Sequence, residues 1–83
     1  MRKVRELYNE ELFIEGFADE LRRKREEQSL SLNQLSEKST VSASFIMRIE
    51  KGERTNVSIE VLFKLANALC INIVQLLENS QKN

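Results

Sequence analysis

The stretch "SASFIMRIEKGE", from Ser42 to Glu53, gathers the residue types of this 83-residue chain that could do chemistry. Hydroxyl-bearing residues lead it, an apolar triplet follows, and a basic and acidic mixture ends beside Gly52. Hydroxyl, guanidinium and ammonium groups donate hydrogen bonds, and the last two carry positive charge. Such groups bind acceptors and anions, so the stretch favours recognition of a partner over catalysis.

The residue types outside this stretch do not suggest an enzyme. The chain has no histidine, no glycine-rich phosphate loop and no paired carboxylates on a recognisable scaffold. Its single cysteine, Cys70, can form neither an internal disulfide nor a zinc site. We expect a buried, inert thiol there among apolar neighbours, with a redox switch as the alternative. No cofactor, metal or small-molecule ligand is expected.

Length and composition predict one small helical domain. A chain of 83 residues with 41% hydrophobic content supports one core, which is marginal without self-association. The absence of proline and the presence of only two glycines favour helices with short connections. No signal-peptide pattern opens the chain, and the stretch "ALCINIVQLL" is too short to span a bilayer. We therefore expect a cytoplasmic protein without a membrane partner.

The charges balance in number but are segregated along the chain. Thirteen basic residues match thirteen acidic ones, and zero net charge counts mildly against nucleic-acid binding. However, acidic residues gather between residues 6 and 20, and the basic run "LRRKR" follows at once. The acidic run is expected to be a solvated face, while Arg22 and Arg23 either extend a basic face or are simply solvated.

Apolar spacing and capping residues predict five helices. The first runs from about Phe13 to Gln28. The second starts after an N-cap at Ser31, where Gln34 completes a capping box, and ends near Ser39. The N-caps of the third, fourth and fifth helices are Ser42, Ser58 and Asn72.

The third helix has a short, well-marked buried face. Phe45, Ile46 and Ile49 form it, and Gly52 suits the left-handed position after the helix. We divide the chain into an N-terminal extension (1–12), a helical domain (13–79) and a frayed tail (80–83).

Two short helices joined by a tight turn inside such a domain are the layout of a helix-turn-helix unit. Residues 21–77 resemble the XRE-type helix-turn-helix family, which includes the lambdoid phage repressors and Cro. The motifs that carry the resemblance are "LRRKR" (21–25), "LS" (30–31), "RIEKGER" (48–54) and "LFKLANAL" (62–69). The "NVSI" after the basic loop is similar to restriction–modification controller proteins. The resemblance implies an all-α, five-helix, lambda-repressor-like DNA-binding domain with a helical or arm-like N-terminal extension.

Three positions depart from the family pattern. Leu32 stands where the family usually has a glutamine that touches a phosphate, and Ser36 replaces a small alanine. Thr40 replaces the usual turn glycine, and a β-branched residue disfavours positive φ. We therefore expect the turn to be slightly rebuilt.

The resemblance makes the third helix a recognition helix whose leading turn enters the major groove of duplex DNA. It implies base contacts from Ala43, Ser44, Met47 and Arg48. Arg48 could reach guanine in bidentate fashion, or be a solvated helix arginine. Met47 could touch a thymine methyl or pack on the surface, and Ser44 could meet a base or a phosphate. The implied phosphate contacts are Ser42, Lys51, Gly52, Arg54 and Asn56.

Glu50 is acidic on a helix that would approach phosphates. The resemblance implies that it pairs with Arg25 of the first helix in a partly buried ion pair that locks the two helices. The alternative is two independent surface charges.

One recognition helix reads only a few base pairs, so a two-fold dimer on two half-sites is expected. The candidate dimer face is apolar, with burial in the monomer core as the alternative for each member: Ile71, Ile73, Val74 and Leu77. The resulting hypothesis is a homodimeric regulator that binds a palindromic operator and responds to its own concentration. The alternative is an antitoxin-type module that neutralises a partner protein through its acidic N-terminal segment.

Overall fold

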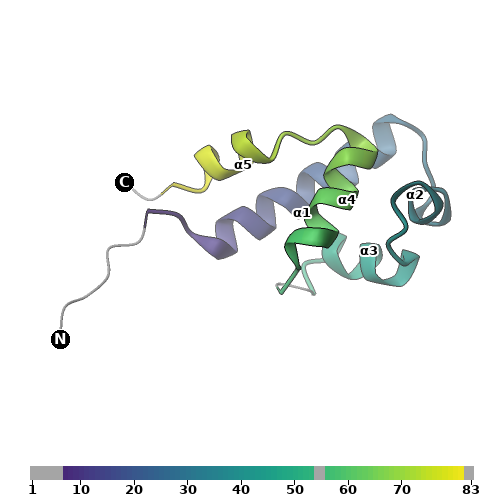
Figure 1. Cartoon of the computed structure of the whole chain (residues 1–83), viewed down its shortest axis with the longest axis horizontal. Helices are drawn as coiled ribbons and strands as arrows, with labels where there is room; N and C mark the ends of the chain where they lie inside the picture. The colour runs from purple at the N-terminus through teal and green to yellow at the C-terminus, as the bar shows by residue number, and fades with distance from the viewer. Residues whose placement is uncertain (1–6, 54–55, 82–83) are drawn as a thin grey trace.

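A computed structural model describes residues 7–53 and 56–81 of the chain. Within these ranges five helices follow one another, and the prediction of an all-α, five-helix domain is confirmed (Figure 1). They are α1 (Glu10–Glu27), α2 (Leu32–Ser39), α3 (Ala43–Glu50), α4 (Ile59–Leu69) and α5 (Ile73–Asn79). The parts of the predicted N-terminal extension and tail at residues 1–6 and 82–83 lie outside the described residues.

Side-chain caps define where the helices begin, because each satisfies an N–H group that has no partner inside the helix. Ser31 forms the predicted capping box with Gln34, and the predicted caps Ser42, Ser58 and Asn72 each accept a backbone N–H. The predicted start of α1 at Phe13 is wrong. Asn9 caps this helix by accepting the Leu12 N–H at 3.1 Å, so α1 begins one turn earlier. Two glutamates follow the cap, and acidic residues suit the positive end of a helix.

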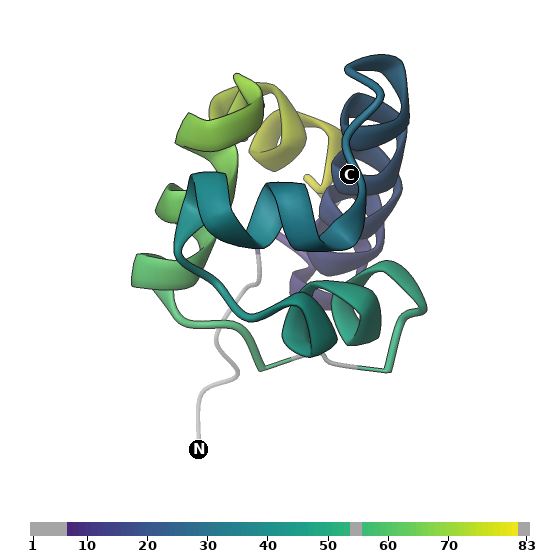
Figure 2. The same ribbon diagram turned by 90° about the vertical axis from the view of Figure 1, so that its right-hand side faces the viewer.

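Four helices meet in one hydrophobic core. Phe17 and Leu21 of α1 are completely buried, and so are Ile46 and Ile49 of α3, as the helical spacing of these residues predicts. Phe45 is half-buried and packs against the same cluster. The other completely buried apolar side chains are Leu35 of α2 and Leu65 and Leu69 of α4. Figure 2 views the end of the molecule where α2 and α3 pack across this core.

Cys70 is exposed, so the prediction of a buried thiol is wrong. Its sequence neighbours Leu69 and Ile71 are both buried. Cys70 itself ends α4 in the left-handed conformation, with φ 60° and ψ 46°. Cys70 lies at the start of the 115° bend between α4 and α5.

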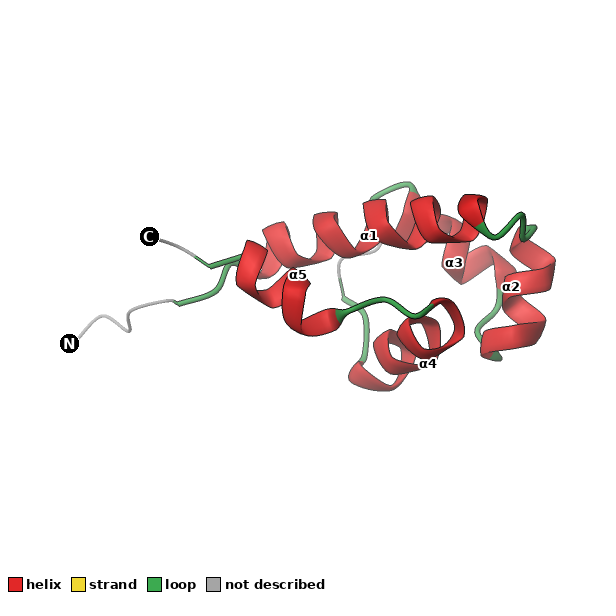
Figure 3. Ribbon diagram, turned by 90° about the horizontal axis from the view of Figure 1, so that it is seen from above, coloured by secondary structure: helices red, strands yellow, loops and turns green. Residues whose placement is uncertain are grey.

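The last helix lies along the first half of α1 (Figures 1 and 3). No side chain of α5 is fully buried, and its Ile73 and Leu76 pack against the edge of the core. Its Leu76 sits over Gly16 of α1. Beyond the helix, the Asn9 N–H donates to the carbonyl of the buried Ser80 at 2.9 Å, and a β-bridge pairs Tyr8 with Gln81. These contacts connect the first and last described residues of the chain.

No single helix in the described ranges has the length and apolar character needed to cross a membrane. The pair α4 and α5 reaches both only when taken together across a 115° bend, which is weak support for a span.

Candidate nucleic-acid interface

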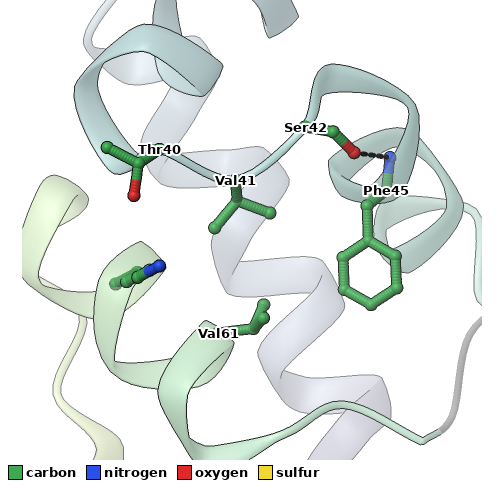
Figure 4. Close-up of a pocket in the computed structure, with 6 residues that line it drawn as sticks. Thr40, Val41, Ser42, Phe45 and Val61 are labelled. Atoms are coloured by element: carbon green, nitrogen blue, oxygen red, sulfur yellow. Dashed lines mark hydrogen bonds between the residues drawn. The ribbon is translucent and has the colours of Figure 1, made fainter.

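The helices α2 and α3 are joined by the short connection Thr40–Ser42, which directs α3 across the end of the core (Figure 2). Thr40 has φ 63° and ψ 18°, the left-handed conformation that the usual glycine would adopt. The expected rebuilding of the turn is therefore not seen, because the β-branched residue itself takes the positive φ. Val41 then turns inward toward α4 and Val61, and Ser42 caps α3 through the Phe45 N–H (Figure 4).

The outer face of α3 carries the four side chains that were predicted to meet bases. Ser44, Met47 and Arg48 are exposed, and Ala43 is half-buried at the start of the helix. Residues four positions apart lie on the same side of a helix. Ala43 and Met47 form one such pair, and Ser44 and Arg48 form the pair next to it. Since the opposite side is anchored by the completely buried Ile46 and Ile49, these four side chains are presented outward from a fixed helix.

The phosphate candidates lie at the two ends of α3. The Ser42 hydroxyl accepts the Phe45 N–H at 3.2 Å, which leaves its own proton to donate. Lys51 and Gly52 are exposed at the other end, where Gly52 has φ 77°. Asn56 is exposed further along the chain, and Arg54 lies outside the described residues.

Arg25 and Glu50 form a bidentate ion pair between α1 and the end of α3. The Arg25 Nε donates to Glu50 Oε2 at 2.7 Å, and Nη2 donates to Oε1 at 2.9 Å. The remaining Nη1 donates to the Leu30 carbonyl at 2.9 Å, which ties in the connection before α2. The side chains are only 14% and 8% exposed. The hydrogen bonds with Glu50 raise the pKa of the Arg25 guanidinium, so this group stays charged.

The other arginines of α1 are engaged within their own helix. Arg22 pairs with Glu26 one turn on, and Arg23 pairs with both Glu20 and Glu27. These partners compensate the positive charges locally. The basic run therefore contributes less to a continuous basic face than its sequence suggests.

Leu32 opens α2 without a polar side chain, half-buried and packed against the core. A buried apolar group at this position helps to hold α2 in place. It cannot supply the hydrogen bond that a glutamine side chain would give to a phosphate.

A second surface lies on the side formed by α1, α4 and α5. An apolar groove of about 670 Å³ runs there, and we name it the α4–α5 groove. All four predicted dimer-face residues line it: Ile71, Ile73, Val74 and Leu77. The rest of the lining comes from Asn67, Asn72 and the apolar side chains of Phe13, Ile59, Leu62, Phe63 and Ala66. Ile59 is 70% exposed, Phe63 55% and Val74 64%, which is high for apolar side chains.

Ile71 differs from the other three, because it is only 7% exposed and belongs to the core cluster as well as to the lining of the groove. For this residue the alternative of core burial holds. Conversely, Phe13, Ile59 and Phe63 were not predicted at this surface. The signal that could have revealed Ile59 and Phe63 is the apolar sector of "IEVLFKLANAL", which is wider than one small core can cover.

Comparison with known proteins identifies similar chains. A family model described as "Helix-turn-helix" matches residues 21–76, which is more than half of the chain. The chain is 47% identical over 58 residues to the "HTH-type transcriptional repressor RghR" of Bacillus subtilis (strain 168). That match covers 70% of this chain but only 43% of RghR, so the chain spans less than half of that relative's length.

Solved structures match over most of this chain. The restriction–modification controller protein C.AhdI from Aeromonas hydrophila is 35% identical, with a TM-score of 0.66. That match covers 76% of this chain and 94% of C.AhdI. SinR of Bacillus subtilis, described as the master regulator for biofilm formation and solved in complex with DNA, is 33% identical with a TM-score of 0.67. The SinR match covers 74% of this chain and 97% of the SinR chain in that structure.

Proposed function

Because this chain belongs to the XRE-type helix-turn-helix family of DNA-binding transcriptional regulators, we propose that it binds a palindromic duplex-DNA operator as a homodimer and regulates its own gene. The observation that carries the proposal is the outer face of α3. Ser44, Met47 and Arg48 are exposed there, beside the half-buried Ala43, on a helix whose inner face is buried. Such a helix fits the major groove of B-form DNA.

Different side chains have different tasks in this proposal. Arg48 reads guanine through O6 and N7, while Ala43 and Met47 touch thymine methyl groups. Ser44 donates to a base edge or to a phosphate. Ser42, Lys51, Gly52, Arg54 and Asn56 hold the DNA backbone, which sets the register and makes affinity depend on salt.

Dimerisation is proposed to occur through the α4–α5 groove. Exposed apolar side chains gather there without a partner in the monomer, and burying them removes apolar area from water. Val74 and Leu77 are the central contacts, with Ile73 beneath them. A second copy would place two α3 helices on opposite half-sites.

Dimerisation would make the proposed autoregulation steep. Since dimers form by mass action, operator occupancy rises steeply with the concentration of the protein itself. The similarity to a repressor and to a controller protein supports regulation of transcription as the outcome.

The test is a gel shift and footprint on the DNA immediately upstream of the protein's own gene. The wild type is compared with Arg48→Ala and with Arg22→Ala, a control that removes an exposed arginine of α1. We expect one protected palindromic region, lost in Arg48→Ala and kept in Arg22→Ala. A well-folded dimer that protects no upstream site even at low salt would contradict the proposal and direct attention to a protein partner.

A further inference from the structure

Four residues in the described ranges have positive φ, and each follows a helix. Three of these turns close in the same way. The N–H after the left-handed residue donates to the backbone carbonyl five residues earlier, as in a Schellman motif. The three bonds are Leu30 N to Arg25 O at 3.0 Å, Glu53 N to Arg48 O at 2.9 Å and Ile71 N to Ala66 O at 2.9 Å.

The turn at Thr40, which leads into α3, closes differently. The Thr40 N–H donates to the Ser36 carbonyl at 2.8 Å, just as the Cys70 N–H donates to the Ala66 carbonyl. The difference is that no backbone carbonyl in the described part of the chain accepts the Val41 N–H. Instead the Val41 N–H donates to the hydroxyl of Ser39 at 3.2 Å. A side chain therefore replaces the backbone bond that closes the other three turns.

This replacement matters because the site is buried. Ser39 is 4% exposed and Val41 is 6% exposed, so little of either residue is open to water. A buried N–H without an acceptor is costly. Thr40 adds a second cost, because a β-branched residue disfavours positive φ. Without the Ser39 hydroxyl, the turn would have both a buried Val41 N–H that lacks an acceptor and an unfavourable positive φ at Thr40.

We propose that Ser39 is the positioning residue for α3, and this inference rests on the proposed function of that helix. Its hydroxyl holds the Val41 N–H, and the turn then places the Val41 side chain in the core toward Val61 (Figure 4). Ser42 follows at once and caps α3. The angle at which α3 leaves the turn is thus set by one buried serine, which allows threonine to stand where glycine usually does.

The first experiment measures amide hydrogen exchange in the free protein by NMR. Ser39→Ala is compared with Ser36→Ala, which removes a hydroxyl from the same helix that makes no hydrogen bond in the described part of the chain. We expect exchange at Val41 to rise about tenfold more than exchange at core amides in Ser39→Ala only. An unchanged Val41 rate would overturn the inference. This readout needs no DNA, so it stands apart from the proposed function.

The second experiment tests coupling to Thr40. Affinity is measured for a duplex that the wild type selects from a random pool. We expect Ser39→Ala to weaken binding about tenfold, and we expect an added Thr40→Gly substitution to restore most of it, because glycine adopts positive φ freely. If Ser39→Ala weakens binding equally with and without Thr40→Gly, the inference is contradicted. If Ser39→Ala does not fold, folding of the double variant supports it, and failure of both overturns it.

Discussion

The Arg25 guanidinium lies side by side with the Glu50 carboxylate and holds it through two hydrogen bonds of 2.7 and 2.9 Å. One partner comes from α1 and the other from the last residue of α3. The pair therefore fixes the far end of α3, while the turn at Thr40 fixes its near end. It also compensates the negative charge of Glu50 within the protein.

Arg25→Ala should loosen or unfold the domain. The variant leaves a largely buried carboxylate without a partner, which typically costs about 3–5 kcal/mol. Urea and thermal unfolding measure the change. Arg22→Ala is the matched control, because its exposed pair within α1 is worth only about 0.2–0.5 kcal/mol. Equal stability of the two variants would rule out a structural role for the Arg25–Glu50 pair.

The two glycines should respond in opposite directions to substitution by alanine. At Gly16 a Cβ would meet Leu76 Cδ2 at 3.6 Å, an ordinary contact, so Gly16→Ala should stabilise the protein by about 1 kcal/mol through helix propensity. Gly52 has φ +77°, so Gly52→Ala should destabilise it by about 1–2 kcal/mol. Chemical denaturation gives both values. Destabilisation by Gly16→Ala would mean that Leu76 of α5 cannot shift to make room for the added methyl group.

Val74→Glu should convert the proposed dimer to a monomer. The substitution places a carboxylate in the α4–α5 groove, at a side chain that is already 64% exposed and therefore not needed by the core. Gln75→Glu is the control, since it adds the same charge at the next position of α5, outside the lining of the groove. Sedimentation equilibrium reports the mass. The same oligomeric state in all three proteins would show that the α4–α5 groove is not a dimer interface.

The pH dependence of stability should contain a small contribution from Glu20. A hydrogen bond from Arg23 holds the pKa of Glu20 below its usual value, while burial opposes this more weakly. A lowered pKa in the folded state adds stability above the unfolded value and loses it as pH falls through the folded value. The stability difference between wild type and Glu20→Gln should therefore be present near neutral pH and vanish in acid. A difference that grows on acidification would have the wrong sign.

Local signals explain the part of the fold that the sequence predicts well. A serine or asparagine before an apolar pattern has a short-range task, so the caps at Ser31, Ser42, Ser58 and Asn72 are predictable. The buried positions Ile46 and Ile49 follow from helical spacing alone. Asn9 was missed because the first turn of α1 has acidic residues and little apolar pattern, although its cap chemistry is plain.

Packing between distant elements explains what was not predicted. Cys70 and Ile71 are adjacent, yet one is exposed and the other is buried, because a left-handed residue separates α4 from the segment before α5. The apolar periodicity of the sequence does not reveal such a bend in the chain. Likewise, the groove depends on how far α5 covers α4, and no local pattern encodes that distance.

The function proposed for this chain depends on whether α3 reads DNA sequence through its outer face. The most direct measurement is selection of duplexes from a random pool by the wild type, Arg48→Ala and the control Arg22→Ala, followed by sequencing. We predict a palindrome for the wild type and for Arg22→Ala. For Arg48→Ala we predict loss of the preference for guanine at one position in each half-site, with the remaining positions kept. An identical motif from wild type and Arg48→Ala, or no enriched motif from a folded wild type, would contradict the claim.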